Sequence, residues 1–190
     1  AILEYSLYGD INQLSRSIKK GIETVGVEVE HLRCAETLPF EILEKMHASP
    51  KAEDVRELTP ANVNELGDFD GIMFGVSARF GGIPAQMKTL MDSTGGLWQS
   101  GKLVGKTAGV FQSTGTMQGG QESVAMNCMS FFAHQGMVFI PVGYIDPKAF
   151  SYEEIHGGSP WGSGTYAGPD GSRQPTSMEL SIAENHGRHF

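Results

Sequence analysis

The feature of this sequence that most constrains its fold is a regular alternation of short apolar runs with segments of helical periodicity. Five runs predict strands, and the third is nearly continuously apolar, as in strands buried on both faces of a parallel sheet: AILEYSL (1–7), GVEVEHL (26–32), FDGIMFGV (69–76), KTAGVFQST (106–114) and GMVFIPVGY (136–144). Strands that alternate with helices are joined by right-handed crossovers. The sequence therefore predicts an α/β fold with a doubly wound, five-stranded parallel sheet and helices on both faces.

Periodicity and capping residues place the helices between these strands. Ile11, Leu14, Ile18 and Ile22 recur at helical spacing. TPANVNEL (59–66) offers a Thr cap, Pro at the first helical position and Gly67 as its end. Further helical segments are PFEILEKMH (39–47, one or two turns), the region after SARFGG up to Thr94, QESVAMNCMSFFAHQ (121–135, with Val124, Cys128, Phe131 and Phe132 inward) and a last helix from SMELSIAEN (177–185).

Length and charge limit the classes of protein and partner. The 190 residues favour one domain, residues 1–190, with a substantial core. The formal net charge of −8 disfavours nucleic acid and anionic membranes as partners. No apolar run approaches the ~20 residues of a membrane span. Cys34 and Cys128 are too few for a disulfide framework, so we expect a reduced, cytoplasmic protein, with a single disulfide as the open alternative.

Three polar loops follow predicted strands: SLYGDIN (6–12, the first loop), SARFGG (77–82, the second loop) and STGTMQGGQE (113–122, the third loop). The carboxyl ends of parallel strands lie at one edge of a sheet, and open α/β sheets bind ligands outside that edge. We therefore expect the three loops to share one rim and to form the ligand site.

The first loop precedes a helix, and a helix N-terminus offers free N–H groups and partial positive charge to a phosphate. Gly9 permits a tight turn, while Ser6 and Asn12 can add hydrogen bonds. No Gly-Lys-Ser/Thr follows the strand and there is no G-x-G-x-x-G, so neither a P-loop nor a classical dinucleotide fold is indicated. The sequence Gly105-Lys106-Thr107 precedes a strand and does not read as a nucleotide loop. A plain helix cap is the alternative to phosphate binding.

The second loop suits a flat ring. Phe80, Gly81 and Gly82 let the backbone approach such a ring, and Arg79 can favour its anionic form. A surface salt bridge is the alternative for Arg79. The third loop adds hydroxyls and glycines before a helix. Trp98 in TGGLWQSG (94–101) is expected near the same rim, either as a wall for a ring or as core.

The histidines and the glycine-rich segment allow two interpretations each. His134 follows an amphipathic helix and either reaches the rim or interacts with the helix dipole. His186 and His189 in HGRH are predicted to lie in a solvated tail, and no metal site is expected. Residues 151–175 are rich in Gly, Pro and Ser, as in a linker, but Trp161 and Tyr166 argue for an ordered loop packed on the protein.

Several segments together resemble the WrbA-type NAD(P)H:quinone oxidoreductases of the flavodoxin-like superfamily. The likeness runs from residue 1 to nearly the end, and residues 34–66, which match less tightly, look more like fungal members. It is carried by YSLYG (5–9), RFGGIPAQMKTLMDSTGGLWQSGKLVGK (79–106), FQSTGT (111–116) with GGQE (119–122), AHQGMVFIPVGY (133–144) and GSRQPTSMELSIA (171–183).

The resemblance implies a flavodoxin-like sheet of strand order 2-1-3-4-5, non-covalently bound FMN, NADH or NADPH as electron donor, and a homotetramer whose sites neighbouring subunits complete. It places His134 at the flavin pocket, Trp98 at the wall of the acceptor site and Tyr8 against the nicotinamide cofactor. It assigns FMN phosphate to Ser6, Leu7, Tyr8, Gly9, Asp10 and Ile11, the isoalloxazine to Ala78, Arg79 and Phe80, and further contacts to Ser113, Thr114, Gly115, Thr116, Met117 and Gln118.

Two departures from the family bear on these assignments. Family members usually carry His where Asp10 stands, so a carboxylate lies beside the expected phosphate dianion. At ~4 Å in a near-surface dielectric their repulsion costs a few kcal/mol, less if the side chain turns to solvent. The third loop is also about one residue longer than the common bacterial form, which affects Met117 and Gln118.

The expected reaction is a two-electron reduction of a quinone by NADH or NADPH through FMN, with donor and acceptor taking turns at one stacking site. Arg79 is expected to stabilise negative charge on the reduced ring, and His134 to orient the quinone or relay a proton. Two alternatives remain: a flavodoxin-like one-electron carrier that docks on protein partners, favoured by the acidity, and a regulatory subunit with a decayed FMN site, favoured by Asp10.

Overall fold

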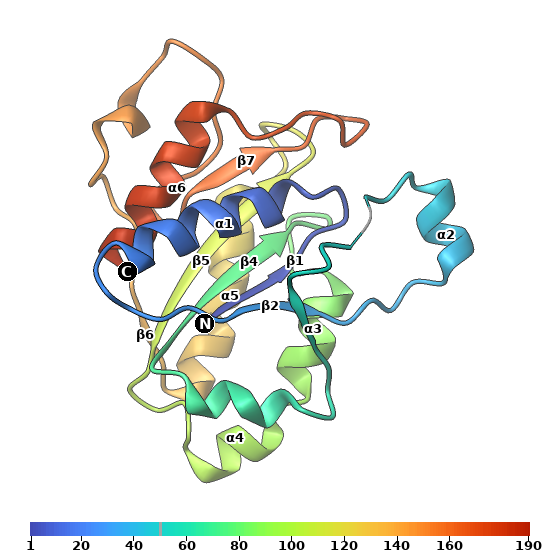
Figure 1. Ribbon diagram of the computed structural model, residues 1–190, viewed down its shortest axis with the longest axis vertical. Helices are drawn as coiled ribbons and strands as arrows, with labels where there is room; N and C mark the ends of the chain where they lie inside the picture. The colour runs from blue at the N-terminus through green and yellow to red at the C-terminus, as the bar shows by residue number, and fades with distance from the viewer. Residues whose placement is uncertain (50) are drawn as a thin grey trace.

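The structure, a computed structural model, describes residues 1–49 and 51–190. Within these residues, seven strands form one sheet, and every strand pair in it is parallel (Figure 1). The strands are β1 (Ile2–Tyr5), β2 (His31–Cys34), β3 (Arg56–Leu58), β4 (Gly71–Ser77), β5 (Thr107–Thr114), β6 (Val138–Phe139) and β7 (Gly164–Tyr166). The sheet order is β3-β2-β1-β4-β5-β6, with β7 also paired to β5. The five expected strands therefore occupy the predicted order 2-1-3-4-5.

The sequence pattern did not predict two of these strands. β3 extends the sheet beyond β2, and β7 pairs with the last three residues of β5, with Thr165 opposite Ser113. Each has only three residues, too few for an alternating pattern to be recognised. Because β7 lies inside the glycine-rich segment, that segment is part of the sheet. In the structure, β7 holds this segment on the body of the protein.

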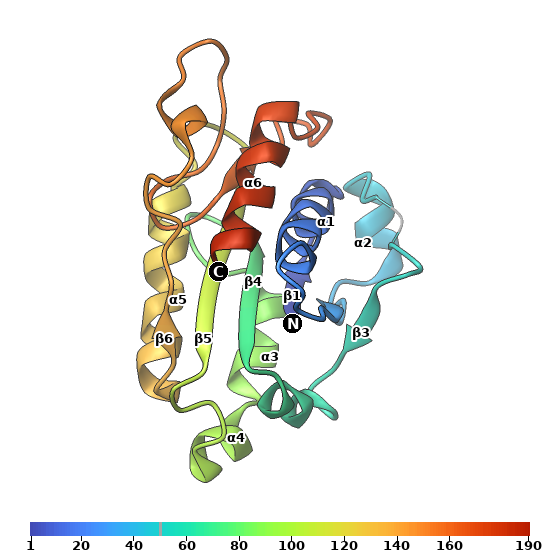
Figure 2. The same ribbon diagram turned by 60° about the vertical axis from the view of Figure 1, so that its left-hand side comes forward.

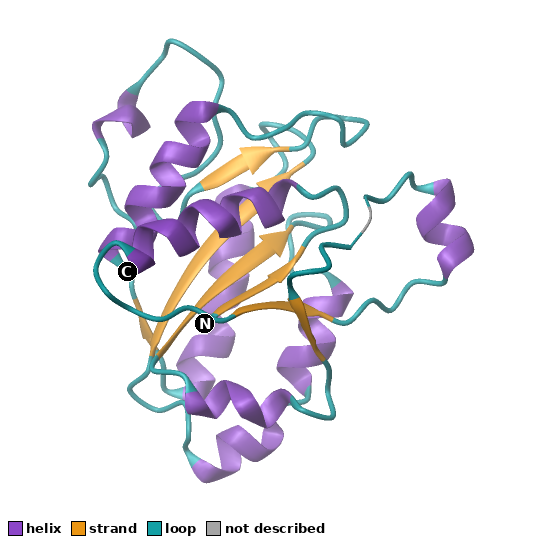
Figure 3. Cartoon of the chain, in the orientation of Figure 1, coloured by secondary structure: helices purple, strands orange, loops and turns teal. Residues whose placement is uncertain are grey.

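Helices cover both faces of the sheet, as predicted (Figure 2). α1 (Asp10–Glu23) and α6 (Ser177–His189) lie on one face, where α1 packs Ile11, Leu14 and Ile18 onto Met73 and Phe111. α3 (Ala85–Asp92) and α5 (Gln121–Gln135) cover the other face, where Met87, Leu90, Val124, Cys128 and Phe132 join the larger core. α2 (Phe40–Lys45) buries none of its residues and stands apart from the sheet (Figure 3), and α4 (Gly95–Ser100) follows α3.

α1 and α6 approach closely because two glycines meet the facing helix. A Cβ built on Gly21 would lie 1.9 Å from the carbonyl oxygen of Glu184, and one on Gly187 would lie 2.2 Å from that of Ile18. Only a residue without a side chain allows this separation of the two backbones. Gly187, in the HGRH segment, is therefore a packing contact between the two helices.

Two local expectations are corrected by the structure. Residues 59–66 do not form an α-helix; a 3-10 helix covers Val63–Asp68, and the Asn62 side chain accepts from the Thr59 N–H. Phe131, predicted inward, is half-buried and packs its ring against Phe74 of the core, at 6.1 Å between centroids. His186 does not lie in a solvated tail, because α6 continues to His189 and its packing on α1 buries His186 completely. Its Nδ1 faces the hydroxyl of Ser163 at 3.0 Å.

Candidate functional site

The first loop presents a row of free backbone donors at the start of α1. Gly9 has φ 84°, the left-handed conformation that a tight strand-to-helix turn requires. Among the described residues, none accepts a hydrogen bond from the backbone N–H groups of Tyr8 to Asn12, and the first bond of the helix is from Gln13 to Gly9. These groups and the helix dipole favour an anion.

Asp10 does not direct its carboxylate outward. The side chain is buried and accepts hydrogen bonds from the hydroxyl of Ser113, on β5, and from that of Ser6 at 3.3 Å. The expectation that this carboxylate could turn to solvent is wrong, because these two hydroxyls hold it inside the fold. Asp10 thereby links the first loop to the end of β5.

The side chain of Asn12 is also turned away from the free N–H groups. Its amide donates to the Glu4 carboxylate at 2.8 Å, in a buried polar cluster on β1. His31 Nε2 lies 3.1 Å from the same carboxylate, and Ser15 also donates to it. In the first loop, therefore, backbone groups rather than the Asn12 side chain face an incoming anion.

The second loop is a tight turn that exposes Phe80. The N–H of Arg79 donates to the carbonyl of Gly82 at 3.0 Å, and the reverse bond measures 2.9 Å. Phe80 and Gly81 between them have φ 52° and 71°. The Phe80 ring is fully exposed. Positive φ at a non-glycine residue is strained and clusters at functional sites, so this turn holds Phe80 at the rim by a fixed backbone geometry.

Arg79 is half-buried, and its guanidinium makes no hydrogen bond or ion pair with any described residue. The surface salt bridge considered as its alternative is therefore absent from residues 1–49 and 51–190. Burial raises the pKa of the nearby Tyr5, as do the charge of Glu36 and the 3.0 Å hydrogen bond to it, while Arg79 lowers it. Because no described residue pairs with the Arg79 guanidinium, its positive charge is available to a ligand at the rim.

The third loop joins the other two. The N–H of Ala78 donates to the carbonyl of Ser113 at 2.8 Å. Thr114 turns its hydroxyl to the carbonyl of Thr116 at 2.8 Å, which closes the loop on itself. The four residues at its tip are exposed, namely Gly115, Thr116, Met117 and Gln118. The expectation that the three loops share one rim is consistent with these contacts.

Trp98 and His134 do not lie at that rim within one chain. A helix that follows a parallel strand runs back to the amino end of the sheet, so α4 and the last turn of α5 lie beyond the edge opposite the loops (Figure 1). The N–H of Gly105 donates to Gly136 at 2.8 Å, which joins the end of α5 to the segment before β5. The prediction that Trp98 lies near the rim is wrong for a single chain, and Trp98 is 63% exposed.

A groove between α3 and α5 connects the second loop with His134. Its volume is about 580 Å³, and its lining includes Gly82 and Ile83 from the second loop region and Asn127 and His134 on α5. Asn127 donates to the carbonyl of Gly81 at 3.3 Å. His134 lies seven residues further along α5, a rise of about 10 Å. His134 is exposed at the far end of this groove.

A fourth segment lies at the rim, and it belongs to the glycine-rich stretch 151–175. Residues Ala167–Gln174, which we term the strap, follow β7 and run over the first and third loops (Figure 1). A Cβ on Gly171 would lie 2.7 Å from the ring of Tyr8, and one on Gly115 would lie 3.5 Å from the carbonyl of Gly168. Trp161, Tyr166 and the resemblance at GSRQP predicted a packed segment here, at an interface or over a site, but not its contact with Tyr8.

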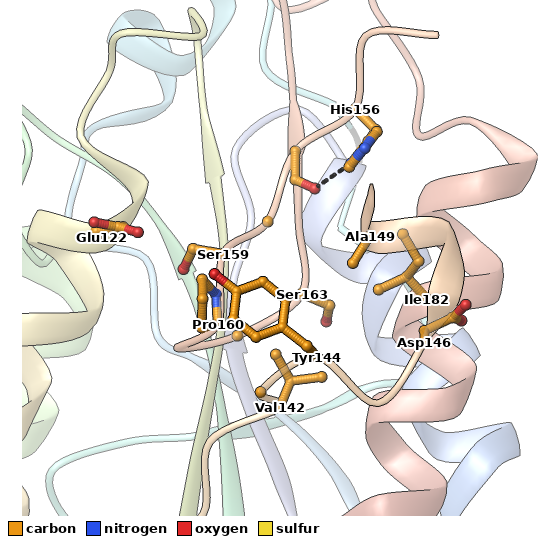
Figure 4. A pocket seen from close by; sticks show the side chains of 14 residues that line it. Glu122, Val142, Tyr144, Asp146, Ala149, His156, Ser159, Pro160, Ser163 and Ile182 are labelled. Atoms are coloured by element: carbon orange, nitrogen blue, oxygen red, sulfur yellow. Dashed lines mark hydrogen bonds between the residues drawn. The ribbon is translucent and has the colours of Figure 1, made fainter. Parts of the chain in front are cut away.

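Beside the strap, a cavity of about 240 Å³ lies between α5, α6 and residues 142–163 (Figure 4). Glu122 stands at the start of α5 on one side, and Asp146 and His156 lie on the other. The N–H of Gly158 donates to Gln121 at 2.6 Å, which attaches this region to the third loop. The glycine-rich segment therefore packs against the third loop, which is part of the rim.

The residues at the rim fit FMN. The free N–H groups of the first loop are donors for a phosphate, and Arg79 supplies positive charge near a ring. A Cβ on Gly82 would meet only the carbonyl of Arg79, at 3.5 Å, among the described residues, so the second loop leaves space for a flat ring. The buried Asp10 carboxylate is the one feature that opposes the phosphate.

Comparisons with known proteins agree with this geometry. Residues 10–150 match the family described as NADPH-dependent FMN reductase. The chain is 47% identical to NAD(P)H quinone oxidoreductase YCP4 of Candida albicans, over all of this chain and 66% of that protein, and 48% identical to Quinone-oxidoreductase QR2 of Triphysaria versicolor, over all of this chain and 91% of that protein. A flavodoxin, WrbA-like protein from Agrobacterium tumefaciens shares the fold with a TM-score of 0.64 at 14% identity, covering 98% of this chain and 90% of that one. No helix in the described part of the chain is long and apolar enough to cross a membrane.

Proposed function

Because this chain belongs to the NADPH-dependent FMN reductase family, we propose that it is an FMN-dependent NAD(P)H:quinone oxidoreductase that reduces quinones by two electrons. The observation that carries the proposal is the rim itself. Free backbone donors at the start of α1 lie on the first loop, and the strained turn at Phe80 and Arg79, which has no partner among the described residues, lie on the second. Hydrogen bonds join both loops to the third. Relatives printed as quinone oxidoreductases support the substrate class.

FMN bound at the rim supplies hydride acceptance and two-electron transfer. The first loop holds the phosphate with backbone N–H groups, which leaves the ring to the second and third loops. Arg79 would supply positive charge next to the ring, which favours the anionic form of a reduced flavin. Phe80, on a turn fixed by two backbone hydrogen bonds, would present its exposed ring beside the flavin site. No residue of this chain is required to form a covalent bond with substrate.

We further propose that the protein assembles as a homotetramer in which Trp98 and His134 complete the rim of a neighbouring copy. Both side chains are exposed at the edge of the sheet opposite their own loops. In that arrangement the Trp98 indole walls the quinone site, and His134 orients the quinone oxygen or delivers a proton to it. Cys34 and Cys128 are both free and buried, which fits a reducing, cytoplasmic compartment.

The test is an anaerobic titration of FMN-loaded protein with NADPH and then with benzoquinone, followed by flavin absorbance. The proposal expects one bleaching transition with NADPH and complete recovery with one equivalent of benzoquinone. Two resolved one-electron transitions with slow NADPH reduction would instead indicate an electron carrier. Protein that remains colourless after incubation with FMN would indicate a regulatory subunit whose cofactor site has decayed.

A further inference from the structure

The strap contacts the first loop through Gly171. Because glycine has no side chain, its backbone can lie directly against an aromatic ring. Gly171 has φ 77°, and a Cβ at that position would lie 2.7–2.8 Å from three ring atoms of Tyr8. Its backbone therefore packs directly on the Tyr8 ring, in the middle of the row of residues expected to hold phosphate. Gln174 accepts a hydrogen bond from Gln13, in the first turn of α1. The strap thus touches both sides of the turn at Gly9.

Arg173 anchors the strap to the body of the protein. Its guanidinium makes a two-pronged pair with Glu179, at 3.1 Å to each carboxylate oxygen, and the Glu179 side chain is fully buried. The same guanidinium donates to the carbonyl of Tyr166 at 2.8 Å and to that of Ile155 at 3.1 Å. Planar two-pronged pairs fix orientation as well as position.

Glu179 is itself held by three other donors. It accepts from the N–H of Gly157 at 2.8 Å, from the N–H of Thr176 at 2.8 Å and from the hydroxyl of Thr165 at 2.7 Å. Thr165 belongs to β7, which pairs with the end of β5 beside the third loop. The anchor is therefore continuous with the sheet, and the position of Gly171 is set by rigid elements.

We propose that the strap braces the phosphate-binding turn, and that Gly171 and Arg173 are positioning residues for the phosphate of FMN. Five free N–H groups bind an anion well only if they keep one direction in the unliganded protein, since ordering them on binding costs affinity. The Tyr8 ring, clamped under Gly171, supplies that order. This inference rests on the proposed FMN binding and does not depend on the quinone reaction.

The experiment is calorimetric titration of the apoprotein with FMN and, separately, with riboflavin, which lacks the phosphate. Gly171→Ala is expected to raise the Kd for FMN at least tenfold and the Kd for riboflavin less than twofold. Arg173→Lys keeps the charge but loses the two-pronged pair, and is expected to show the same selectivity with a smaller change. Gly105→Ala is the matched control, because Gly105 has φ 78° and no described atom within 4 Å of a built Cβ.

Equal weakening of FMN and riboflavin by Gly171→Ala, or no change in either, would overturn the proposal. If Gly171→Ala does not fold, hydrogen exchange of the wild-type strap amides decides: FMN is expected to slow their exchange more than riboflavin, and equal protection would refute the brace. FMN-loaded protein that fails to reduce quinones refutes the proposed function alone. Wild-type protein that binds neither flavin refutes both.

Discussion

The carboxylate of Asp10, the first residue of α1, accepts a hydrogen bond from the hydroxyl of Ser113, near the end of β5. Both residues are buried. Asp10 therefore joins the first and third loops at the position where a phosphate would bring two further negative charges. The Asp10 side chain joins two loops and would also repel a phosphate. Substitutions can separate these two effects.

Asp10→Asn is expected to bind FMN more tightly by at least about tenfold, because a neutral amide removes a repulsion of about a few kcal/mol that the solvent does not screen at this buried position. The same variant is expected to lose about 1 kcal/mol of stability without FMN, because hydrogen bonds to a charged acceptor are stronger than those to a neutral one. Calorimetry with FMN and thermal melting of the apoprotein measure the two effects.

Ser113→Ala serves as the control for Asp10→Asn. It removes the same hydrogen bond but keeps the carboxylate, so the apoprotein is expected to melt at lower temperature while FMN binding does not tighten. A comparable gain in FMN affinity in both variants would show that the charge of Asp10 has no part in it.

The burial of His186 lets us predict how the free energy of unfolding changes with pH. Burial, and to a smaller degree the charge of His189, lowers the pKa of His186 from 6.5 to about 3. The unfolded chain therefore binds a proton below about pH 6.5 that the folded protein excludes until about pH 3, so stability falls as the pH drops through this window. The free energy of unfolding is expected to decrease by about 2 kcal/mol between pH 7 and pH 5 from this residue.

His186→Gln is expected to remove most of that slope in urea unfolding measured across this pH range. His189→Gln, on the exposed side of the same helix, is the matched control and should keep the wild-type slope. A slope that survives in His186→Gln would assign the pH dependence to other groups.

The contact between α1 and α6 gives a prediction about glycines. Gly21→Ala and Gly187→Ala are each expected to destabilise the protein by several kcal/mol, on the order of an overpacked core, because the new methyl would meet a backbone carbonyl rather than a movable side chain. Gly95→Ala in α4, where no described atom lies within 4 Å of a built Cβ, is expected to stabilise by about 0.5 kcal/mol. Denaturant midpoints would check the opposite signs.

If neighbouring copies share a site, two inactive variants should rescue each other. Arg79→Ala disables the site on the loops of its own chain. His134→Ala removes the side chain that its chain would contribute to the site of a neighbouring copy. Refolding the two together at equal amounts is expected to restore about a quarter of wild-type activity, the fraction of sites built from two intact halves. Activity no higher than the average of the separate variants would mean that each chain forms its own site.

The sheet and the shared rim were predictable because they depend on periodicity and on the geometry of parallel strands. Ile11, Leu14 and Ile18 indicated α1, and loops that follow parallel strands must lie at one edge. The direction of the Asp10 side chain was not predictable, because it depends on Ser113, which is distant in sequence. The place of Trp98 and His134 away from the rim follows from the same geometry, because a helix after a parallel strand carries its last turn to the opposite edge.

The glycine-rich segment is a second case in which contacts with distant residues decide the local structure. Its composition is that of a linker, and its order comes from one buried carboxylate, Glu179, and the groups that converge on it. A composition-based interpretation cannot detect such an anchor, because its partners are scattered through the segment. The misjudged tail at His186 has the same cause, since Gly187 signals a helix end locally but allows a close helix contact in the folded chain.

The contact between the strap and the start of α1 joins parts of the chain that lie 161 positions apart, as the pair Gln13 and Gln174 shows. During synthesis the first loop leaves the ribosome well before the strap that covers it. Contacts of such long range form late in folding. Much of the sheet and its core can therefore form before the strap packs on Tyr8, so a ligand that depends on this contact binds only after the strap has been made.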